Sequence, residues 1–491
     1  MRYTDFTIEE IDSVMNNAWI TFHVYRKLSL QQRAAFMKAI AVELENSGDE
    51  LIHTAMQETN LTEARLRGER ARTIFQLTSY ADACEKGEWL QARIDHANAD
   101  KIPPKPDIRK MLVPLGPVVV FGSSNFPFAY STAGGDTACA FAAGCPVIVK
   151  AHPAHVLTST MVAEAIHKAA EKCNLPKNVF AHVYGESFEV GKALVMHPYT
   201  KAVGFTGSYS GGKQLFDWGN QRKEPIPVFA EMGSINPVFL LNEKLNSEAA
   251  AIAKMYAASI TLGVGQFCTN PGLIIGIESN ALKTFIHDLG KEIKQILPAP
   301  MLHAGIVKAY KEKKSNALLQ EGVHLVAESE TIVKESEGLP TIATATAQTF
   351  LTNPLLHQEV FGPYSIVISC KNESEMLAVA NKLEGQLTAT LMATENDIAK
   401  NEPLVEAVKN ICGRFILNGV PTGVEVCAAM QHGGPFPAST DSRFTAVGAD
   451  GIKRFARPIA FQNWPDVLLP DELKEANPLN IWRMVDNEWK K

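Results

Sequence analysis

The stretch VVVFGSSNFPFAYSTAGGDTACAFAAGCPVIVK, residues 118–150, decides the fold class of this chain. It begins and ends with short β-branched runs, and the small-residue segment between them, 132–144, suits a helix. Similar apolar runs follow at 179–183, 202–205 and 237–241, again separated by helical patterns. Continuous apolar strands that alternate with helices predict parallel β-α-β units covered on both faces. We therefore expect an α/β protein with a doubly wound sheet.

The segments on either side have different patterns of apolar and polar residues. Apolar residues recur at helical spacing from about residue 7 to 90, which predicts a helical layer. The polar stretch 95–110 carries three prolines and suits an extended arm. After a boundary near Leu240, a second series of strand candidates predicts a second α/β domain; its members are 273–277, 365–368, 387–391 and 414–418.

Composition excludes several classes of function. Lys plus Arg total 47 against 53 Asp plus Glu, a net charge of −6 that offers no basic excess for nucleic acid. The N-terminus lacks a signal pattern, and no apolar stretch approaches the ~20 residues of a membrane span. The eight cysteines form no Cys-x-x-Cys pair and no zinc-type spacing with histidine. We expect a cytoplasmic protein with reduced thiols, no structural metal, and no nucleic-acid or membrane partner.

One cysteine stands out from the other seven. Cys268 lies in Gly-Val-Gly-Gln-Phe-Cys-Thr-Asn-Pro-Gly, residues 263–272, where glycines and a proline predict a turn or irregular loop. Most cysteines are small buried hydrophobes, and that is the alternative. Glu231 occupies another breaker-rich stretch, Phe229-Ala-Glu-Met-Gly-Ser-Ile-Asn-Pro. Its carboxylate suits a general base, particularly if partial burial raises its pKa toward neutrality; a solvated loop acid is the alternative.

Three further stretches place polar groups in turns. Asn125 follows the strand that ends at Phe121, where a doubly wound sheet binds ligands, although an Asn that closes a turn explains the string too. The string Gly204-Phe-Thr-Gly-Ser-Tyr-Ser-Gly-Gly-Lys predicts a helix from Ser208, whose N-terminus suits a pyrophosphate. This string is not G-x-G-x-x-G, and an ordinary capped helix explains it equally well. In His357-Gln-Glu-Val-Phe-Gly-Pro, an acid and a ring suit a sugar and a flat heterocycle, with a plain surface turn as the alternative.

Taken together, five motifs in one order resemble the aldehyde dehydrogenase superfamily: Asn125-Phe-Pro, Phe205-Thr-Gly-Ser, Glu231-Met-Gly, Gly265-Gln-Phe-Cys and Glu359-Val-Phe-Gly-Pro. The likeness runs from about residue 20 to 460. Within it, several strings look like the α-ketoglutaric semialdehyde (2,5-dioxovalerate) dehydrogenase branch; they are Ser123-Ser-Asn-Phe-Pro-Phe, Val149-Lys-Ala-His-Pro-Ala-His, Thr269-Asn-Pro-Gly and His432-Gly-Gly-Pro-Phe-Pro-Ala-Ser.

The resemblance implies a catalytic role for each of three residues. Cys268 would attack the aldehyde, and the adduct would pass hydride to nicotinamide and leave a thioester. Asn125 would donate its side-chain N–H, together with the backbone N–H of Cys268, to the oxyanion. Glu231 would activate the water that hydrolyses the thioester. The implied reaction converts 2,5-dioxopentanoate to 2-oxoglutarate. Alternatives are an NADP-dependent fatty or broad-specificity aldehyde dehydrogenase, a cysteine hydrolase without redox cofactor, and a non-catalytic binding protein.

The resemblance also implies a set of cofactor-binding positions, which are Lys150, Pro153, Gly207, Ser208, Gly212, Glu359 and Phe361. Lys150 would contact the adenosine ribose. Members of the family that prefer NAD usually carry a Glu three residues later, and this chain has Pro153 there, which favours NADP. NAD stays possible, because Phe188 stands near the place where the branch often carries an Arg for the 2′-phosphate. Arg443 is one candidate for the substrate carboxylate, with a surface arginine as the alternative.

The expected architecture has a Rossmann-type cofactor-binding domain, an α/β catalytic domain and an oligomerisation arm. Five segments are expected: a helical part of the cofactor-binding domain at 1–94, an extended arm at 95–115, the dinucleotide-binding domain at 116–240, the catalytic domain at 241–430, and a C-terminal return and oligomerisation segment at 431–491. The partners implied are a small aldehyde and further copies of the chain, in a homodimer or homotetramer.

Overall fold

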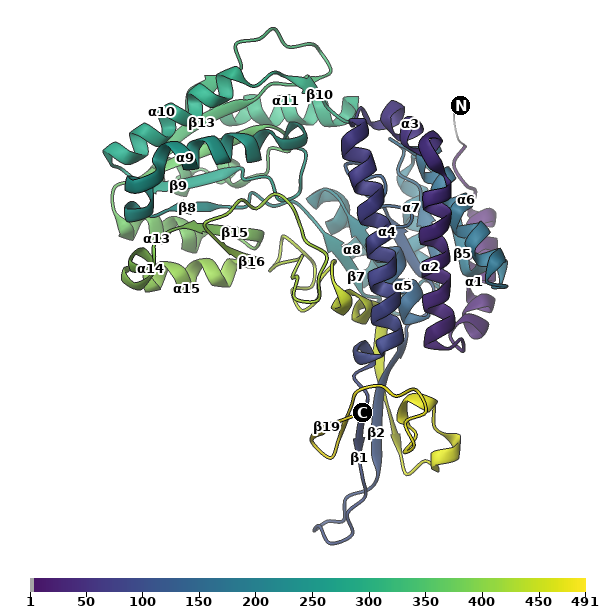
Figure 1. The fold of residues 1–491 in the computed structure, drawn as a ribbon. Coiled ribbons are helices and arrows are strands. Elements are labelled where there is room, and N and C mark those ends of the chain that lie inside the picture. The colour runs from purple at the N-terminus through teal and green to yellow at the C-terminus, as the bar shows by residue number, and fades with distance from the viewer. Residues whose placement is uncertain (1–3) are drawn as a thin grey trace.

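In a computed structural model that describes residues 4–491, two α/β bodies sit side by side above a narrow stalk (Figure 1). The first three residues of the expected segment 1–94 lie outside the described residues. Within the described residues, eight α-helices belong to the first body: α1 (Ile8–Tyr25), α2 (Leu30–Asn46), α3 (Gly48–Thr59), α4 (Glu63–Lys86), α5 (Gly135–Ala143), α6 (Val156–Lys172), α7 (Phe188–Met196) and α8 (Tyr209–Gln221).

The sheet of the first body is parallel throughout, as the opening stretch predicts. Its order is β5 (Phe180–Val183), β4 (Val147–Lys150), β3 (Val118–Phe121), β6 (Ala202–Thr206) and β7 (Val228–Glu231). Successive side chains of a strand face opposite sides of a sheet. Val118 and Val120 accordingly join the core under α2, α5 and α6, whereas Val119 joins the core under α1, α7 and α8. The expected α/β, doubly wound arrangement is confirmed.

The second body has a seven-stranded sheet with helices on both faces (Figure 1). Its order is β11 (His324–Glu328), β13 (Thr341–Thr346), β14 (Tyr364–Cys370), β9 (Leu273–Ile277), β8 (Val238–Leu240), β15 (Gln386–Met392) and β16 (Cys412–Leu417), with only the edge strand β11 antiparallel. Its helices are α9 (Asn242–Thr261), α10 (Asn280–Gln295), α11 (Ala304–Leu318), α12 (Ala347–Thr352), α13 (Glu373–Lys382), α14 (Glu395–Lys400) and α15 (Glu402–Ile411). A two-residue ladder joins β10 (Ala299–Pro300) to β12 (Glu337–Gly338).

One strand lies in a different sheet from the one that the sequence suggested. The run at 237–241 follows the first strand series along the chain, but β8 pairs with β9 and β15 of the second sheet. The chain crosses between the bodies just before it, at residues 232–237. Apolar periodicity cannot distinguish the last strand of one sheet from the first strand of the next, because both are buried on both faces.

The stalk is a mixed sheet built from two distant parts of the chain. Its order is β17 (Ala456–Gln462), β2 (Ile108–Pro114), β1 (Arg93–Asp95), β18 (Arg483–Val485) and β19 (Glu488–Lys490). The long antiparallel pair β2 and β17 fixes the C-terminal segment against the proline-bearing arm (Figure 1). Among residues 4–491, no helix combines the length and the apolar composition that crossing a bilayer requires.

Candidate active site

The strand order of the first sheet locates a binding crevice. The chain runs outward from β3 to β4 and β5 and then returns to place β6 on the other side of β3. Ligands of doubly wound sheets bind at such a reversal, beyond the carboxyl ends of the strands. A cavity of about 410 Å³ opens there, between the turns after β3 and β6 and the loops of the second body. Seven predicted site residues line it: Asn125, Gly207, Ser208, Glu231, Cys268, Glu359 and Phe361.

The Cys268 loop is held in place from several sides. Asn236, fully buried and in the left-handed region, donates through Nδ2 to the carbonyls of Cys268 and Asn270, both at 2.9 Å. Gly265 has a φ of +64°, and a Cβ there would lie 2.3 Å from the Gly362 carbonyl. Only glycine permits this contact, which ties the Cys268 loop to the turn that follows Glu359. The irregular presentation of the thiol that the breakers predict is therefore present.

A histidine that sequence reasoning did not single out joins the thiol and Glu231. His432 Nε2 lies 3.1 Å from Glu231 Oε2 and 3.9 Å from Cys268 Sγ. Both the imidazole and the carboxylate are buried, with 2% and 5% of the side chain exposed. Neither carboxylate oxygen accepts a well-aligned hydrogen bond from residues 4–491. The three groups thus form a compact cluster with acceptor capacity left for a ligand or a water.

Local backbone pairing brings this histidine into the site. Residues 438–440 run along β7: Met232 N donates to the Ala438 carbonyl at 2.8 Å, and Thr440 N donates to the Ala230 carbonyl at 3.1 Å. His432 N donates to Thr445 Oγ1 at 2.9 Å, which fixes the start of the segment. The string His432-Gly-Gly-Pro was visible in the sequence, but the pairing that carries it to Glu231 is tertiary.

The cluster sets the protonation of the thiol and the carboxylate in opposite directions. Burial, together with the adjacent Glu231 carboxylate, raises the pKa of Cys268 well above its usual range. Burial also works to raise the pKa of Glu231, but the neighbouring His432 and Cys268 side chains outweigh it, and the pKa is lowered. The condition considered from the sequence, a Glu231 pKa raised toward neutrality by burial, is therefore not met. The resting site holds a protonated thiol beside a carboxylate.

Asn125 lies next to the same loop. Its Nδ2 donates to the Gln266 carbonyl at 3.0 Å, which orients the amide and leaves its second N–H available. Within residues 4–491 the backbone N–H of Cys268 has no acceptor. Asn125 and Cys268 line the same cavity and each has an N–H without an acceptor among residues 4–491, which suits a developing oxyanion.

Some of the predicted cofactor-binding residues line the cavity and others do not. Ser208 caps α8, its Oγ accepting from Gly211 N at 3.2 Å, so the N-terminus of α8 opens into the cavity beside Gly207. Gly212 does not line the cavity; a Cβ there would lie 2.6 Å from Met232 Cγ, so it permits close packing of α8. Lys150 ends β4, with a pKa lowered by burial, and Pro153 is exposed in the following turn.

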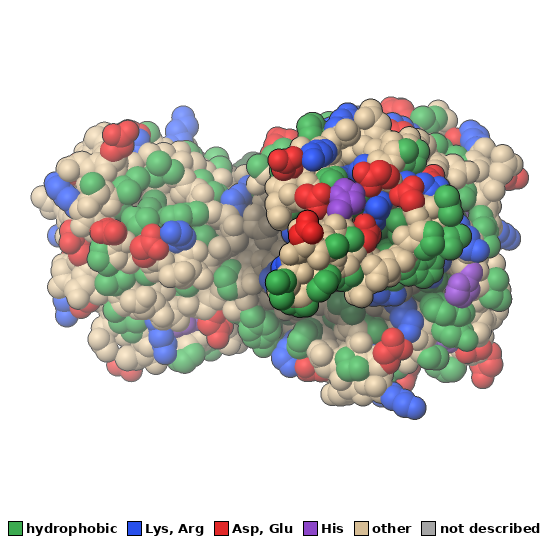
Figure 2. Space-filling model, turned by 90° about the horizontal axis from the view of Figure 1, so that it is seen from below, with side chains coloured by type: hydrophobic (Ala, Val, Ile, Leu, Met, Phe, Trp, Pro, Cys, Tyr) green, Lys and Arg blue, Asp and Glu red, His purple; other side chains and the backbone are tan. Residues whose placement is uncertain are grey.

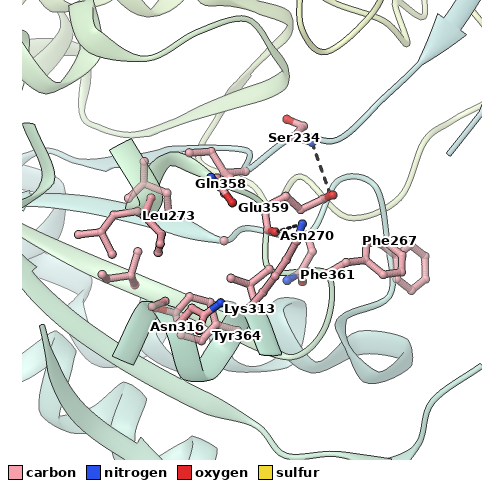
Figure 3. Close-up of a pocket in the computed structure, with 17 residues that line it drawn as sticks. Ser234, Phe267, Asn270, Leu273, Lys313, Asn316, Gln358, Glu359, Phe361 and Tyr364 are labelled. Carbon is pink, nitrogen blue, oxygen red and sulfur yellow. Dashed lines mark hydrogen bonds between the residues drawn. The ribbon is translucent and has the colours of Figure 1, made fainter. Parts of the chain in front are cut away.

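Glu359 also lines the cavity and lies in the turn before β14. Its Oε1 accepts from Ser234 N at 3.5 Å, and Lys313 Nζ donates to its carbonyl at 2.9 Å (Figure 3). Burial raises the pKa of this carboxyl to about 7. Phe361 lines both the main cavity and a smaller one of about 50 Å³ behind Glu359. An acid and an aromatic ring are thus available in the wall of the cavity.

Other candidates from the sequence lie elsewhere. The Arg443 side chain is 80% exposed and paired with Asp441 at 2.5 Å, so it is a surface arginine, away from the cavity. His152 lines the cavity, whereas His155 is fully buried and contacts the Ser123 carbonyl through Nε2 at 2.9 Å. His155 therefore fastens the turn after β3 and does not line the cavity.

Known proteins match this chain over most of its length. Residues 1–452 match the aldehyde dehydrogenase family. An α-ketoglutaric semialdehyde dehydrogenase of Acinetobacter baylyi is 44% identical over 99% of this chain and 92% of its own. A second enzyme of that name, from Azospirillum brasilense, is 46% identical over 95% and 89%. Among solved structures, glyceraldehyde-3-phosphate dehydrogenase GapN from Methanocaldococcus jannaschii has the same fold, with a TM-score of 0.78 at 20% identity over 94% of this chain and 95% of its own. The chain belongs to the aldehyde dehydrogenase family.

Proposed function

We propose that the protein oxidises 2,5-dioxopentanoate, α-ketoglutaric semialdehyde, to 2-oxoglutarate with NADP or NAD. The observation that carries the proposal is the cluster of Cys268, Glu231 and His432 at the mouth of a crevice formed by a doubly wound sheet. The curated relatives at 44% and 46% identity support the substrate, because they bear the name of this activity.

In the first half of the reaction, the thiol must lose its proton and bond to the aldehyde carbon. The resting thiol is protonated, and the Glu231 carboxylate and His432 Nε2 are within reach of that proton. The oxyanion of the resulting thiohemiacetal accepts from Asn125 Nδ2 and the Cys268 N–H. A nicotinamide held in the crevice would supply the hydride acceptor for this carbon. The Cys268 side chain then carries a thioester.

In the second half, water attacks the thioester and the bond to Sγ breaks. Glu231 is the group suited to take the water proton, because it is an ionised carboxylate whose oxygens accept no well-aligned hydrogen bond from residues 4–491. The products are the free acid, one reduced cofactor and one proton. His432 serves as a positioning residue that keeps Glu231 ionised by its 3.1 Å contact.

The cofactor crevice fits a dinucleotide. The N-terminus of α8 presents backbone N–H groups to the cavity, which suits a pyrophosphate, and the Glu359 carboxylate and Phe361 ring line the same cavity. Lys150 would hold the adenosine ribose. We propose NADP as the preferred cofactor, because the exposed Pro153 places no carboxylate at the position where NAD-preferring relatives carry one. GapN of Methanocaldococcus jannaschii was solved with NADP.

The stalk supports association of several copies. Seen from below, hydrophobic side chains gather on the projecting part of the molecule (Figure 2). Large exposed side chains of the arm and the C-terminal segment are Ile102, Trp464, Val467, Leu468, Trp482 and Trp489. Exposed apolar patches of this kind mark protein interfaces. We propose a homodimer or homotetramer, tested by sedimentation at micromolar concentration; a cytoplasmic location stays a prediction.

The proposed function is tested with a matrix of aldehydes against NAD and NADP. We expect absorbance of reduced cofactor at 340 nm with 2,5-dioxopentanoate, and a higher kcat/KM with NADP. Absence of reduced cofactor with 2,5-dioxopentanoate, other semialdehydes and fatty aldehydes would contradict the proposal. Hydrolysis of an activated ester without any dinucleotide, in a protein that oxidises no aldehyde, would favour a cysteine hydrolase.

A further inference from the structure

Helix α4 presents charged side chains to the turn that follows β3. Arg65, Glu69 and Arg72 are spaced i, i+4, i+7 and share one face of the helix. The Arg65 guanidinium pairs with buried Glu69 at 2.7 Å, and Glu69 Oε1 accepts from Phe128 N and Ala129 N. The charge of Arg65 is thus balanced within the protein.

Arg72 lies one aromatic ring away from the catalytic cluster. Its Nη2 donates to Tyr130 Oη at 3.3 Å, and its Nη1 donates to the Val424 carbonyl. The Tyr130 ring lies 5.9 Å from the His432 ring, measured between centroids, and His432 Nε2 is 3.9 Å from the Cys268 Sγ.

A second guanidinium reaches the same loop from the second body. Arg414, on β16, donates through Nη1 to the Gly423 carbonyl at 2.8 Å and through Nη2 to the Pro421 carbonyl. Loop 421–424 therefore contacts both Arg72 and Arg414, which come from opposite sides of the interface between the two bodies.

Neither charge is compensated by the protein. Within residues 4–491, no carboxylate oxygen lies within 4 Å of Arg72 or Arg414. The Nε of each is buried and has no acceptor. Burial lowers the pKa of the Arg414 guanidinium, and the opposing influence of Cys268 and Tyr130 on this pKa agrees with a position close to the thiol. A half-buried cation without a counter-charge is costly, and an anion that bonds to the free donors removes that cost.

We propose that Arg72 and Arg414 recognise the carboxylate of the substrate and select aldehydes with an anionic far end. This inference rests on the proposed function and names the residues behind its substrate class. Guanidinium groups suit the task because their planar donors pair with both oxygens of a carboxylate. The competing explanation is that the two arginines only hold loop 421–424 in place.

Kinetics with two aldehydes of equal carbon number separate these explanations. Arg72→Met and Arg414→Met are measured with 2,5-dioxopentanoate and with pentanal, beside Arg443→Met as the matched control. Loss of a hydrogen-bonded charge predicts a fall in kcat/KM for 2,5-dioxopentanoate of about 10- to 100-fold, mostly in KM. Turnover of pentanal should change by less than about threefold, and Arg72→Lys and Arg414→Lys should recover part of the loss. Arg443→Met should match the wild type.

Equal losses for both aldehydes would overturn the inference in favour of the loop-holding role, and no loss for either would overturn it outright. A wild-type protein that oxidises pentanal but not 2,5-dioxopentanoate would also contradict it. A wild type that oxidises neither would instead contradict the proposed function.

A cofactor-free measurement covers variants that fold poorly. In the wild type, glutarate should slow alkylation of Cys268 by iodoacetamide, followed by peptide mass spectrometry, whereas uncharged glutaramide should not. Equal protection by both compounds, or by neither, would contradict an anion site next to the thiol.

Discussion

Removal of the Asn125 amide tests the oxyanion site quantitatively. In Asn125→Ala, the bond to the Gln266 carbonyl at 3.0 Å is lost along with the second N–H of the amide. The bond to the Gln266 carbonyl is present in both the ground state and the transition state. Its loss therefore raises the free energy of both equally and leaves the rate unchanged. The second N–H acts only on the developing charge, and such a donor contributes about 3 kcal/mol. At 1.36 kcal/mol per tenfold, hydride transfer should slow about 150-fold.

The assay is stopped-flow formation of reduced cofactor in the first turnover. The burst rate should fall about 150-fold, whereas its amplitude per active site and the cofactor Kd should stay those of the wild type. Asn178→Ala, at an exposed position between α6 and β5, is the matched control and should leave the burst unchanged. A loss below about fivefold, or one confined to cofactor binding, would refute the assignment of Asn125 to the oxyanion.

Three further predictions concern the charged groups of the site. In His432→Gln, the imidazole no longer opposes the effect of burial on Glu231, so the pKa of Glu231 should rise. The steady rate after the burst needs the Glu231 carboxylate, so as the pH is lowered this rate should be lost at a higher pH than in the wild type. An unchanged pH profile would contradict the 3.1 Å contact as the cause of the lowered pKa. Glu359, with a pKa of about 7, should become negatively charged as the pH rises through 7. NADP affinity, measured by protein fluorescence, should therefore rise over that range and should not depend on pH in Glu359→Gln. Because the protonated Glu359 side chain is the form that burial favours, the protein without cofactor should lose stability over the same rise in pH. Zn²⁺ should inhibit by binding Cys268, Glu231 and His432, whose ligand atoms lie within 4.8 Å of one another, and EDTA should restore full activity; inactivation by EDTA alone would indicate a resident metal.

Local sequence predicts the architecture well because strand and helix signals are short-range. The runs at 118–121 and 147–150 became neighbouring parallel strands, and Cys268 lies in the irregular loop that its glycines predict. The order of the five motifs indicated the family, which no single motif could do. The assignment of the strand at 237–241 to the first sheet was wrong, because tertiary contacts rather than apolar content decide which strands pair.

The electrostatics of the site could not be predicted from the sequence. His432 stands 201 positions from Glu231 along the chain, and only the pairing of 438–440 with β7 brings them together. Without that neighbour, burial alone would raise the Glu231 pKa, which is the direction that the sequence suggested. Arg443, next to a promising motif, lies on the surface, whereas Arg72 and Arg414 carry no local pattern that distinguishes them.

The most direct test of the account is a comparison of Glu231→Gln with Cys268→Ser in the first turnover. Glu231→Gln should form about one equivalent of reduced cofactor per site and then stall, with an acyl adduct on Cys268 visible by mass spectrometry. Cys268→Ser should give no burst and no adduct. If both variants lack the burst, or if both turn over at similar steady rates, the division of labour between nucleophile and hydrolytic base is contradicted.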